Sequence, residues 1–194
     1  MATFQPIDDT TDFSAHTFEG PTGMDADSGL FRDPAKMVLL FNAAKALAST
    51  RELDQLLNVI ISEVQQVLQC EGSGVLLYDP KSEEFYWRKV KDKESFLASA
   101  SGEIRIPKDK GVCGWVFNRG EPALVNDAIN DPRIYRGVEE KSGFTTRNMV
   151  CVPLQARDQP LGVLYALNKI DNSCSQEDVE ILTALGTYVA LALE

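Results

Sequence analysis

Residues 147–169 read "RNMVCVPLQARDQPLGVLYALNK", and this stretch decides the fold. Two apolar runs, 147–155 and 161–169, flank the segment "ARDQP", a pattern that predicts a β-hairpin. Neither run alternates cleanly between apolar and polar residues, so we expect both faces of the hairpin to be buried. A hairpin covered on both faces predicts an antiparallel sheet at the centre of the domain.

Helical patterns stand at both ends of the chain. Residues 175–194 predict a long helix, with Ser175 as its N-cap and Asp178 as the acid of a capping box. Apolar residues at helical spacing predict a second helix over 53–68, and Asp33-Pro34 is a typical start for another one. We expect the terminal helices to cover one face of the sheet.

Short elements fill the middle of the chain. The patterns predict strands at 74–79, 85–90, 103–107 and 122–125, a helix at 111–120 that ends at Gly120, and a further helix that begins at Asp131-Pro132. We expect the short helices and loops of residues 91–146 to cover the second face, above a pocket. The predicted fold class is α/β (α+β), an antiparallel sheet with terminal helices on one face and ligand-covering short helices and loops on the other.

The charge and the hydropathy of the chain limit the partners that it can have. The net charge of the 194 residues is −10, which disfavours nucleic acid and anionic membranes. No apolar run approaches the roughly 20 residues that span a bilayer, and no signal peptide opens the chain, so we expect a cytoplasmic protein. The predicted organisation is a flexible acidic tail at 1–32, a linker or dimerisation helix at 33–50, and a domain at 51–194 that ends in a signalling helix.

Histidine and cysteine usage excludes several chemistries. The single histidine, His16, lies in the polar tail, so histidine-dependent catalysis and haem ligation are not expected. No C-x-x-C motif occurs, which argues against zinc-ribbon and thioredoxin chemistry. We expect no catalytic residue and no metal ligand. The four cysteines, Cys70, Cys113, Cys151 and Cys174, are widely spaced, and three of them sit in apolar surroundings and are interpreted as reduced core thiols.

The candidate site starts from a spacing pattern. Tyr135, Glu139, Ser142 and Thr146 are four, three and four residues apart, so they would share one face of a helix that continues through Ser142. Spacing alone leaves two readings open, a solvent-facing stripe or a polar wall against a small ligand. The start of such a helix would offer backbone N–H groups to a phosphate.

Three motifs, taken together and in this order, resemble a GAF domain: "GVCGWV" (111–116), "DAINDPRIYRGVE" (127–139) and "SGFTTRNMVCVP" (142–153). The resemblance covers roughly residues 50 to 194 and is greatest to the cyclic-nucleotide-binding GAF domains of phosphodiesterases and cyanobacterial adenylyl cyclases. It implies a regulatory small-molecule sensor, not an enzyme, that binds cAMP or cGMP and needs no other cofactor. It also implies a larger signalling protein whose output domain is missing from this chain.

The resemblance implies roles for individual residues. Gly74 and Tyr165 stand where some relatives have a Ser and a Glu that contact the base, so polar readout of the base is weakened, and Trp87 or Arg88 is the candidate to compensate. The implied ligand-binding residues are Arg88, Val112, Cys113, Tyr135, Glu139, Ser142, Thr146 and Tyr165.

The family's "NKFDE" signature is partly present as Asn168, Lys169 and Asp178, and in relatives the Lys–Asp pair ties the sheet to the last helix. Relatives also pair two subunits through terminal helices, which implies a homodimer through the apolar stripes at 40–47 and 182–193. Two alternatives stay open. One is a ligand-free GAF dimerisation module, and the other is a free methionine sulfoxide reductase, for which Cys113 and Cys151 would have to approach each other.

Overall fold

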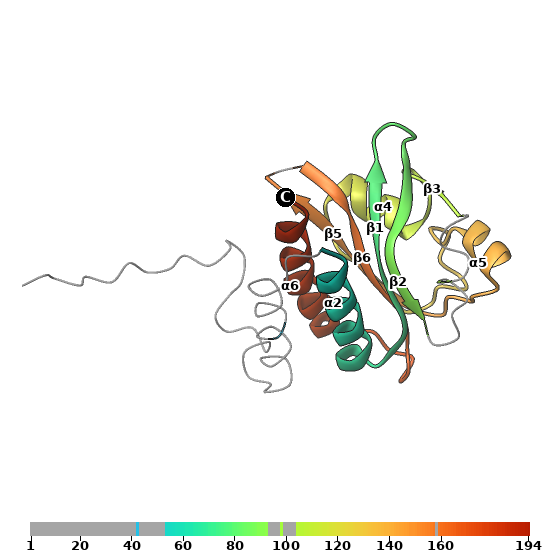
Figure 1. The fold of residues 1–194 in the computed structure, drawn as a ribbon. Coiled ribbons are helices and arrows are strands. Elements are labelled where there is room, and N and C mark those ends of the chain that lie inside the picture. Colours follow the sequence, from blue (N-terminus) through green and yellow to red (C-terminus); the bar gives the residue numbers. More distant parts are fainter. Residues whose placement is uncertain (1–41, 43–52, 93–97, 99–103, 158) are drawn as a thin grey trace, which may run out of the picture.

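A computed structural model of the chain describes residues 42, 53–92, 98, 104–157 and 159–194 (Figure 1). These residues form a six-stranded antiparallel sheet in the order β3-β2-β1-β6-β5-β4, together with four helices. The predicted fold class is confirmed. The predicted tail at 1–32 with His16 and the predicted helix at 33–50 lie outside the described residues, apart from residue 42.

The predicted central hairpin is β5 (Met149–Ala156) and β6 (Gln159–Lys169). On its other side β6 pairs with β1 (Cys70–Asp79), so β6 lies in the middle of the sheet. Val163, Leu164 and Tyr165 are consecutive and are all buried. The expected burial on both faces of this hairpin is therefore confirmed.

The outer strands lie close to their predicted positions. β2 (Glu84–Asp92) pairs with β1, β3 (Ile106–Pro107) extends that edge, and β4 (Ala123–Val125) pairs with β5 at the opposite edge. The register between β1 and β2 shifts, because Val75 lies opposite Lys89 while Leu76 lies opposite Trp87. Arg88 is therefore the extra residue of a β-bulge, which changes the direction of the side chains around it.

The first face of the sheet is covered by α2 (Leu53–Leu68) and α6 (Gln176–Leu193), which lie side by side (Figure 1). α6 begins at the predicted capping box, in which Ser175 and Asp178 exchange hydrogen bonds. Leu182, Leu185 and Val189 of α6 are each 0% exposed and pack against the sheet. The prediction that this stripe is available for subunit pairing is therefore wrong, because the sheet of the same chain already covers it.

The second face is covered by α4 (Gly111–Arg119) and α5 (Arg136–Ser142). α4 ends at Gly120 in the left-handed conformation, as predicted. The prediction that a helix begins at Asp131-Pro132 is wrong, since the helix begins at Arg136. The Asp131 carboxylate instead accepts hydrogen bonds from the Arg133 backbone N–H at 2.8 Å and the Arg133 guanidinium at 2.6 Å. It closes a turn and does not cap a helix.

All four cysteines are buried free thiols. Burial raises the pKa of the Cys70 thiol from its ordinary value of 9.0 to about 12. The protonated Sγ donates a hydrogen bond to the Gly72 carbonyl. The folded chain therefore holds the Cys70 proton at a pH where the unfolded chain releases it.

This raised pKa predicts a loss of stability at alkaline pH. The Cys70 contribution is fully present below pH 9 and is lost between pH 9 and 12, where the unfolded state binds fewer protons. The free energy of unfolding should fall by up to about 1.4 kcal/mol per pH unit for this thiol. In urea titrations at pH 8, 9.5 and 10.5, Cys70→Ala should show a shallower slope than the wild type. Equal slopes would contradict the prediction.

Candidate ligand-binding site

A cavity of about 70 Å³ lies between the sheet and the helices of its second face. Its walls are mainly apolar and come from β1, β2, β3, β5, β6, α4, α5 and the loops beside them. The cavity brings together six of the predicted ligand-binding residues: Val112, Cys113, Tyr135, Glu139, Thr146 and Tyr165.

Two predicted residues do not line this cavity. The Ser142 hydroxyl donates to the Val138 carbonyl at 2.7 Å and accepts from the Phe144 backbone N–H at 3.2 Å, so it stabilises the end of α5. Arg88 forms an ion pair with Asp54 of α2 at 2.8 Å, on the other face of the sheet. Trp87, and not Arg88, is the β2 residue at the cavity.

Glu139 joins α5 to the loop that follows it. One carboxylate oxygen accepts from the Arg136 guanidinium at 2.6 Å, and the other accepts from the Thr146 backbone N–H at 2.7 Å. Thr146 lies beyond Gly143, the left-handed residue that ends α5, so the prediction that it shares a helical face is wrong. The carboxylate of Glu139 nevertheless brings Thr146 to the same wall of the cavity.

The Thr146 side chain has an unusual environment. The residue is only 9% exposed and lines the cavity, and within the part of the chain that the structure describes its hydroxyl has no hydrogen-bond partner. The first turn of α4, Gly111 to Cys113, lines the same cavity, and its N-cap Lys110 makes no side-chain capping bond. The first N–H groups of a helix have no partner within the helix. Thr146 and the first turn of α4 therefore place at this cavity hydrogen-bonding groups that have no protein partner among the described residues.

Tyr165 forms the inner wall. Its hydroxyl accepts a hydrogen bond from the Trp87 indole N–H at 2.7 Å, and the residue is 3% exposed. Burial raises the pKa of the Tyr165 phenol well above its usual value of 10.0, even though the Trp87 hydrogen bond acts in the opposite direction. The phenol therefore stays neutral and keeps its proton at physiological pH.

Cys113 of α4 and Cys151 of β5 belong to one buried cluster, in which Cys113 lies near enough to raise the pKa of the Cys151 thiol. The approach between them that the sequence left open is thus present. Burial, with a further contribution from Cys113, raises the pKa of the Cys151 thiol well above 9.0. A thiolate is the reactive form of cysteine, so this environment makes Cys151 a poor nucleophile.

The amide of Asn168 fastens the loop that carries Thr146. Its oxygen accepts from the Arg147 backbone N–H at 2.7 Å, and its NH₂ group donates to the Thr145 carbonyl at 2.9 Å and to the Glu71 carboxylate at 3.0 Å. Asn168 is 1% exposed and has a positive φ of 57°. One side chain therefore holds both neighbours of Thr146 in place.

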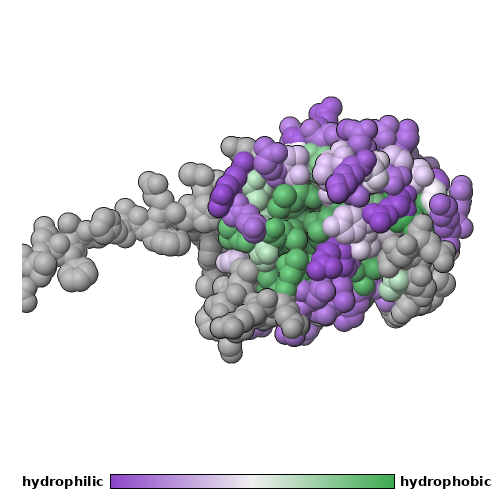
Figure 2. All heavy atoms as spheres, turned by 45° about the horizontal axis from the view of Figure 1, so that its top comes forward, coloured by the Kyte–Doolittle hydropathy of each residue, from purple (hydrophilic) through white to green (hydrophobic). Residues whose placement is uncertain are grey.

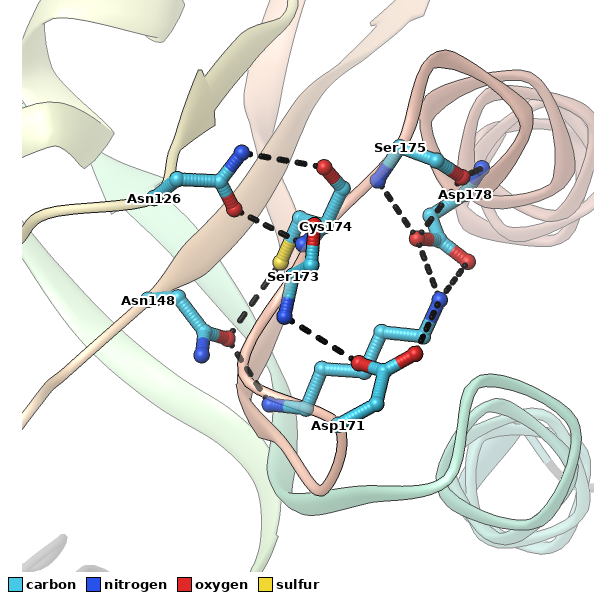
Figure 3. A network of polar contacts seen from close by, with 8 residues as sticks. Asn126, Asn148, Asp171, Ser173, Cys174, Ser175 and Asp178 are labelled. Carbon is cyan, nitrogen blue, oxygen red and sulfur yellow. Dashed lines mark hydrogen bonds and ion pairs between the residues drawn. The ribbon is translucent and has the colours of Figure 1, made fainter.

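A second polar network connects the end of β6 to the start of α6 (Figure 3). Lys169 pairs with both oxygens of Asp178, at 2.8 and 3.1 Å, so the predicted Lys169–Asp178 pair is present. Asn126 and Asn148 also belong to this network, and sequence reasoning missed them. Asn126 binds both backbone polar groups of Cys174, and Asn148 accepts from the Lys169 backbone N–H and the Cys174 thiol. Partners so distant along the chain leave no local pattern.

A family model of the GAF domain matches residues 50–194, and the chain belongs to the GAF domain family. It is 25% identical over 185 residues to the probable 3',5'-cyclic phosphodiesterase pde-5 of Caenorhabditis elegans. That alignment covers 92% of this chain and 25% of the relative, so the chain spans about a quarter of the length of that protein.

Solved structures share the fold. The GAF domain of a phosphoenolpyruvate-protein phosphotransferase from Coxiella burnetii has a TM-score of 0.73 and 16% identity, over 83% of this chain and 95% of the other. A free methionine-R-sulfoxide reductase from Neisseria meningitidis, solved with its substrate, has a TM-score of 0.67 and 19% identity, over 82% and 90%. Within the described residues, no helix combines the length and the apolar character needed to cross a bilayer.

Proposed function

We propose that this chain is a regulatory GAF domain that binds a cyclic nucleotide, cAMP or cGMP, and relays binding to an output domain through α6. The observation that carries the proposal is the buried residue Thr146, which lines the cavity and whose hydroxyl has no hydrogen-bond partner among the described residues. Leaving such a group unsatisfied costs about 1–3 kcal/mol, so a bound ligand is a physical explanation for it. The match to a cyclic phosphodiesterase supports the same ligand class.

The α4 N-terminus adds a preference for an anion. Its N–H groups and helix dipole attract negative charge. Lys110, whose ammonium pairs with the Asp109 carboxylate at 3.4 Å, lies at the same end of the helix. The remainder of the cavity is mainly apolar and contains aromatic side chains, which suits a flat ring. An anionic group joined to a flat ring is the chemistry of a cyclic nucleotide.

The size of the cavity requires motion. Pockets for small molecules are typically about 300–1,000 Å³, whereas this cavity is about 70 Å³. We define the lid as α5 with residues 143–147. The Arg136 guanidinium holds the lid against the carbonyls of Ala128 and Ile129, at 2.9 and 2.7 Å. Ligand entry must displace the lid, so binding and conformation are coupled, as a sensor requires.

A thermal-shift panel tests the ligand class. At a hundredfold excess over Kd, cAMP or cGMP should stabilise the wild type by about 2.7 kcal/mol, which raises Tm by roughly 5–10 °C. Thr146→Ala should lose most of this shift without lowering the Tm of the free protein, because the hydroxyl has no partner among the described residues.

Thr145→Ala is the matched control, since it removes the same group from the exposed neighbouring residue. It should keep the ligand-induced shift. The proposal fails if no cyclic mononucleotide at millimolar concentration moves the Tm of the wild type. If Thr145→Ala and Thr146→Ala lose the same part of the ligand-induced Tm shift, Thr146 is not a ligand-binding residue.

The proximity of Cys113 to Cys151 favours a second candidate, a free methionine sulfoxide reductase, whose fold this chain shares. The raised pKa of the Cys151 thiol argues against it. An assay with free methionine sulfoxide and a thiol reductant separates the two functions. Turnover that is lost in Cys113→Ser or Cys151→Ser would make the chain an enzyme.

The small cavity favours a third candidate, a GAF module that pairs subunits without a ligand. It predicts no Tm shift with cAMP, cGMP, cyclic dinucleotides, free amino acids or 2-oxo acids. A shift with any one of these compounds would exclude it.

We also propose a homodimer. The apolar stripe of α6 is used in the core, so the surface available on that helix is its outward side, where Leu191 is 57% exposed. Figure 2 shows an area of apolar residues framed by hydrophilic ones on the face that it displays. Light scattering at tens of micromolar should give the mass of a dimer, and Leu191→Glu should give that of a monomer. Ile129→Glu, at an exposed residue in the other layer, should leave the dimer intact. A wild-type monomer would refute the dimer.

A further inference from the structure

Gly74 and Tyr165 face each other on the neighbouring strands β1 and β6. A Cβ atom on Gly74 would lie 2.4 Å from the Tyr165 hydroxyl oxygen and 2.7 Å from Cζ, closer than real Cβ contacts. The end of the Tyr165 ring therefore lies directly over bare backbone. The absence of a side chain at Gly74 therefore makes room for the Tyr165 phenol.

The β-bulge in β2 provides the second part of this arrangement. Because Arg88 is the extra residue and pairs with Asp54 on the other face, Trp87 is left at the cavity, where its indole N–H reaches the Tyr165 hydroxyl. The Trp87–Tyr165 hydrogen bond spans β2 and β6, which are separated by β1. It holds the phenol at one position in the inner wall.

The direction of this hydrogen bond determines what the phenol offers. An indole nitrogen only donates, so the Tyr165 oxygen accepts from Trp87 and its own proton must point elsewhere. Among the described residues no acceptor for that proton is found, and Tyr165 is 3% exposed. Both carboxylate oxygens of Glu139, across the cavity, are already engaged. The Tyr165 O–H is therefore a buried donor at the inner wall of the cavity.

We propose that Tyr165 is a specificity-determining residue of this site, whose O–H, oriented by Trp87, donates a hydrogen bond to a ring nitrogen or carbonyl oxygen on the inner edge of the ligand. The ligand is then a heteroaromatic compound that presents an acceptor, and not an amino group, to this wall. The identification of this compound as a cyclic nucleotide rests on the proposed function. The new element is the kind of ligand atom that the protein recognises.

Deaza analogues of cAMP test the contact atom by atom. Calorimetry would compare cAMP with its 1-deaza, 3-deaza and 7-deaza analogues, each of which replaces one acceptor nitrogen by C–H, on the wild type and on Tyr165→Phe. If only cGMP binds, its 3-deaza, 7-deaza and 6-deoxo analogues serve instead. The variant should bind the parent nucleotide about tenfold more weakly. One analogue should bind both proteins equally, because it lacks the atom that Tyr165 contacts.

Controls separate the hydroxyl from general effects. Tyr188→Phe removes a hydroxyl from α6, on the other face of the sheet, and should bind like the wild type. Unchanged binding of the parent nucleotide by Tyr165→Phe would overturn the proposal. The same affinity ratio between the two proteins for every analogue would also overturn it.

If no nucleotide binds, the proposed function fails, and two further measurements still test the role of Tyr165. Gly74→Ala should lower the Tm. Tyr165→Ala in the same chain should remove part of that loss, because the clash with the Tyr165 ring disappears while a Cβ on Gly74 would still lie 2.9 Å from the Lys89 carbonyl oxygen. A Gly74→Ala variant with an unchanged Tm, or one whose loss of Tm is the same with and without Tyr165, would overturn the proposal. Imidazole and pyrrole, which differ by one acceptor nitrogen, can be compared by ligand-detected NMR at pH 8. Imidazole should be preferred by the wild type and not by Tyr165→Phe. Equal binding, or no binding of either fragment, counts against Tyr165.

Discussion

Gly162→Ala should lower the free energy of unfolding by about 3 kcal/mol or more, enough to leave much of the chain unfolded. Gly162 lies on β6, where a Cβ atom would be 2.0 Å from the Leu76 carbonyl oxygen and 2.9 Å from the Leu77 Cα. Both atoms belong to the backbone of β1, the neighbouring strand. A methyl group can fit only if the two central strands separate, which breaks their hydrogen bonds.

Urea denaturation followed by circular dichroism measures this loss. Gly72→Ala is the matched control, because Gly72 is also a buried glycine in the sheet but its added Cβ would meet nothing closer than 3.5 Å. The control should change stability by no more than about 1 kcal/mol. If the two variants unfold at the same urea concentration, the close approach of β6 to β1 at Gly162 is not a constraint.

Asn168→Ala should lower the free energy of unfolding by about 3 kcal/mol. The substitution removes the amide that binds the Arg147 N–H, the Thr145 carbonyl and the Glu71 carboxylate. It also forces alanine to adopt a φ of 57°, which costs an L-residue roughly 1–2 kcal/mol. Because the released loop carries Thr146, the ligand-induced Tm shift should also be lost.

Two companion variants separate the causes. Asn168→Gly tolerates the positive φ but lacks the amide, so the difference between the glycine and alanine variants measures the backbone cost. Asn172→Ala places alanine at a φ of 59° in an exposed position and should cost only the backbone contribution. An Asn168→Ala variant as stable as Asn172→Ala would show that the Asn168 hydrogen bonds contribute nothing.

Much of the fold could be predicted because its signals are local. Apolar spacing placed α2, the two apolar runs placed the β5–β6 hairpin, and Ser175 with Asp178 placed the start of α6. The prediction at Asp131 failed because an Asp-Pro pair is typical both of a helix start and of a turn. The position of Arg133, which binds the carboxylate, decided for the turn.

The candidate site could be predicted only in part. Tyr135, Glu139 and Thr146 line one cavity, but Thr146 does so from a loop, where the Glu139 carboxylate holds its N–H. The choice between Trp87 and Arg88 depended on a one-residue bulge. A single extra residue exchanges the faces of a strand, and nothing in the alternation of residues 85–90 marks where it lies.

The sequence by itself determined which segments are helices and strands, that the sheet is buried on both faces, and which motifs indicate a GAF domain. These properties depend on neighbours within a few residues or on the motif itself. Only the tertiary structure decided that Tyr165 fills the space above Gly74, that Asn168 holds the Thr146 loop, and that Leu182 and Leu185 pack in the core. Strand register brings together residues that are tens of positions apart, and hydrogen bonds and close contacts depend on distances of a few tenths of an ångström that spacing along the chain does not specify.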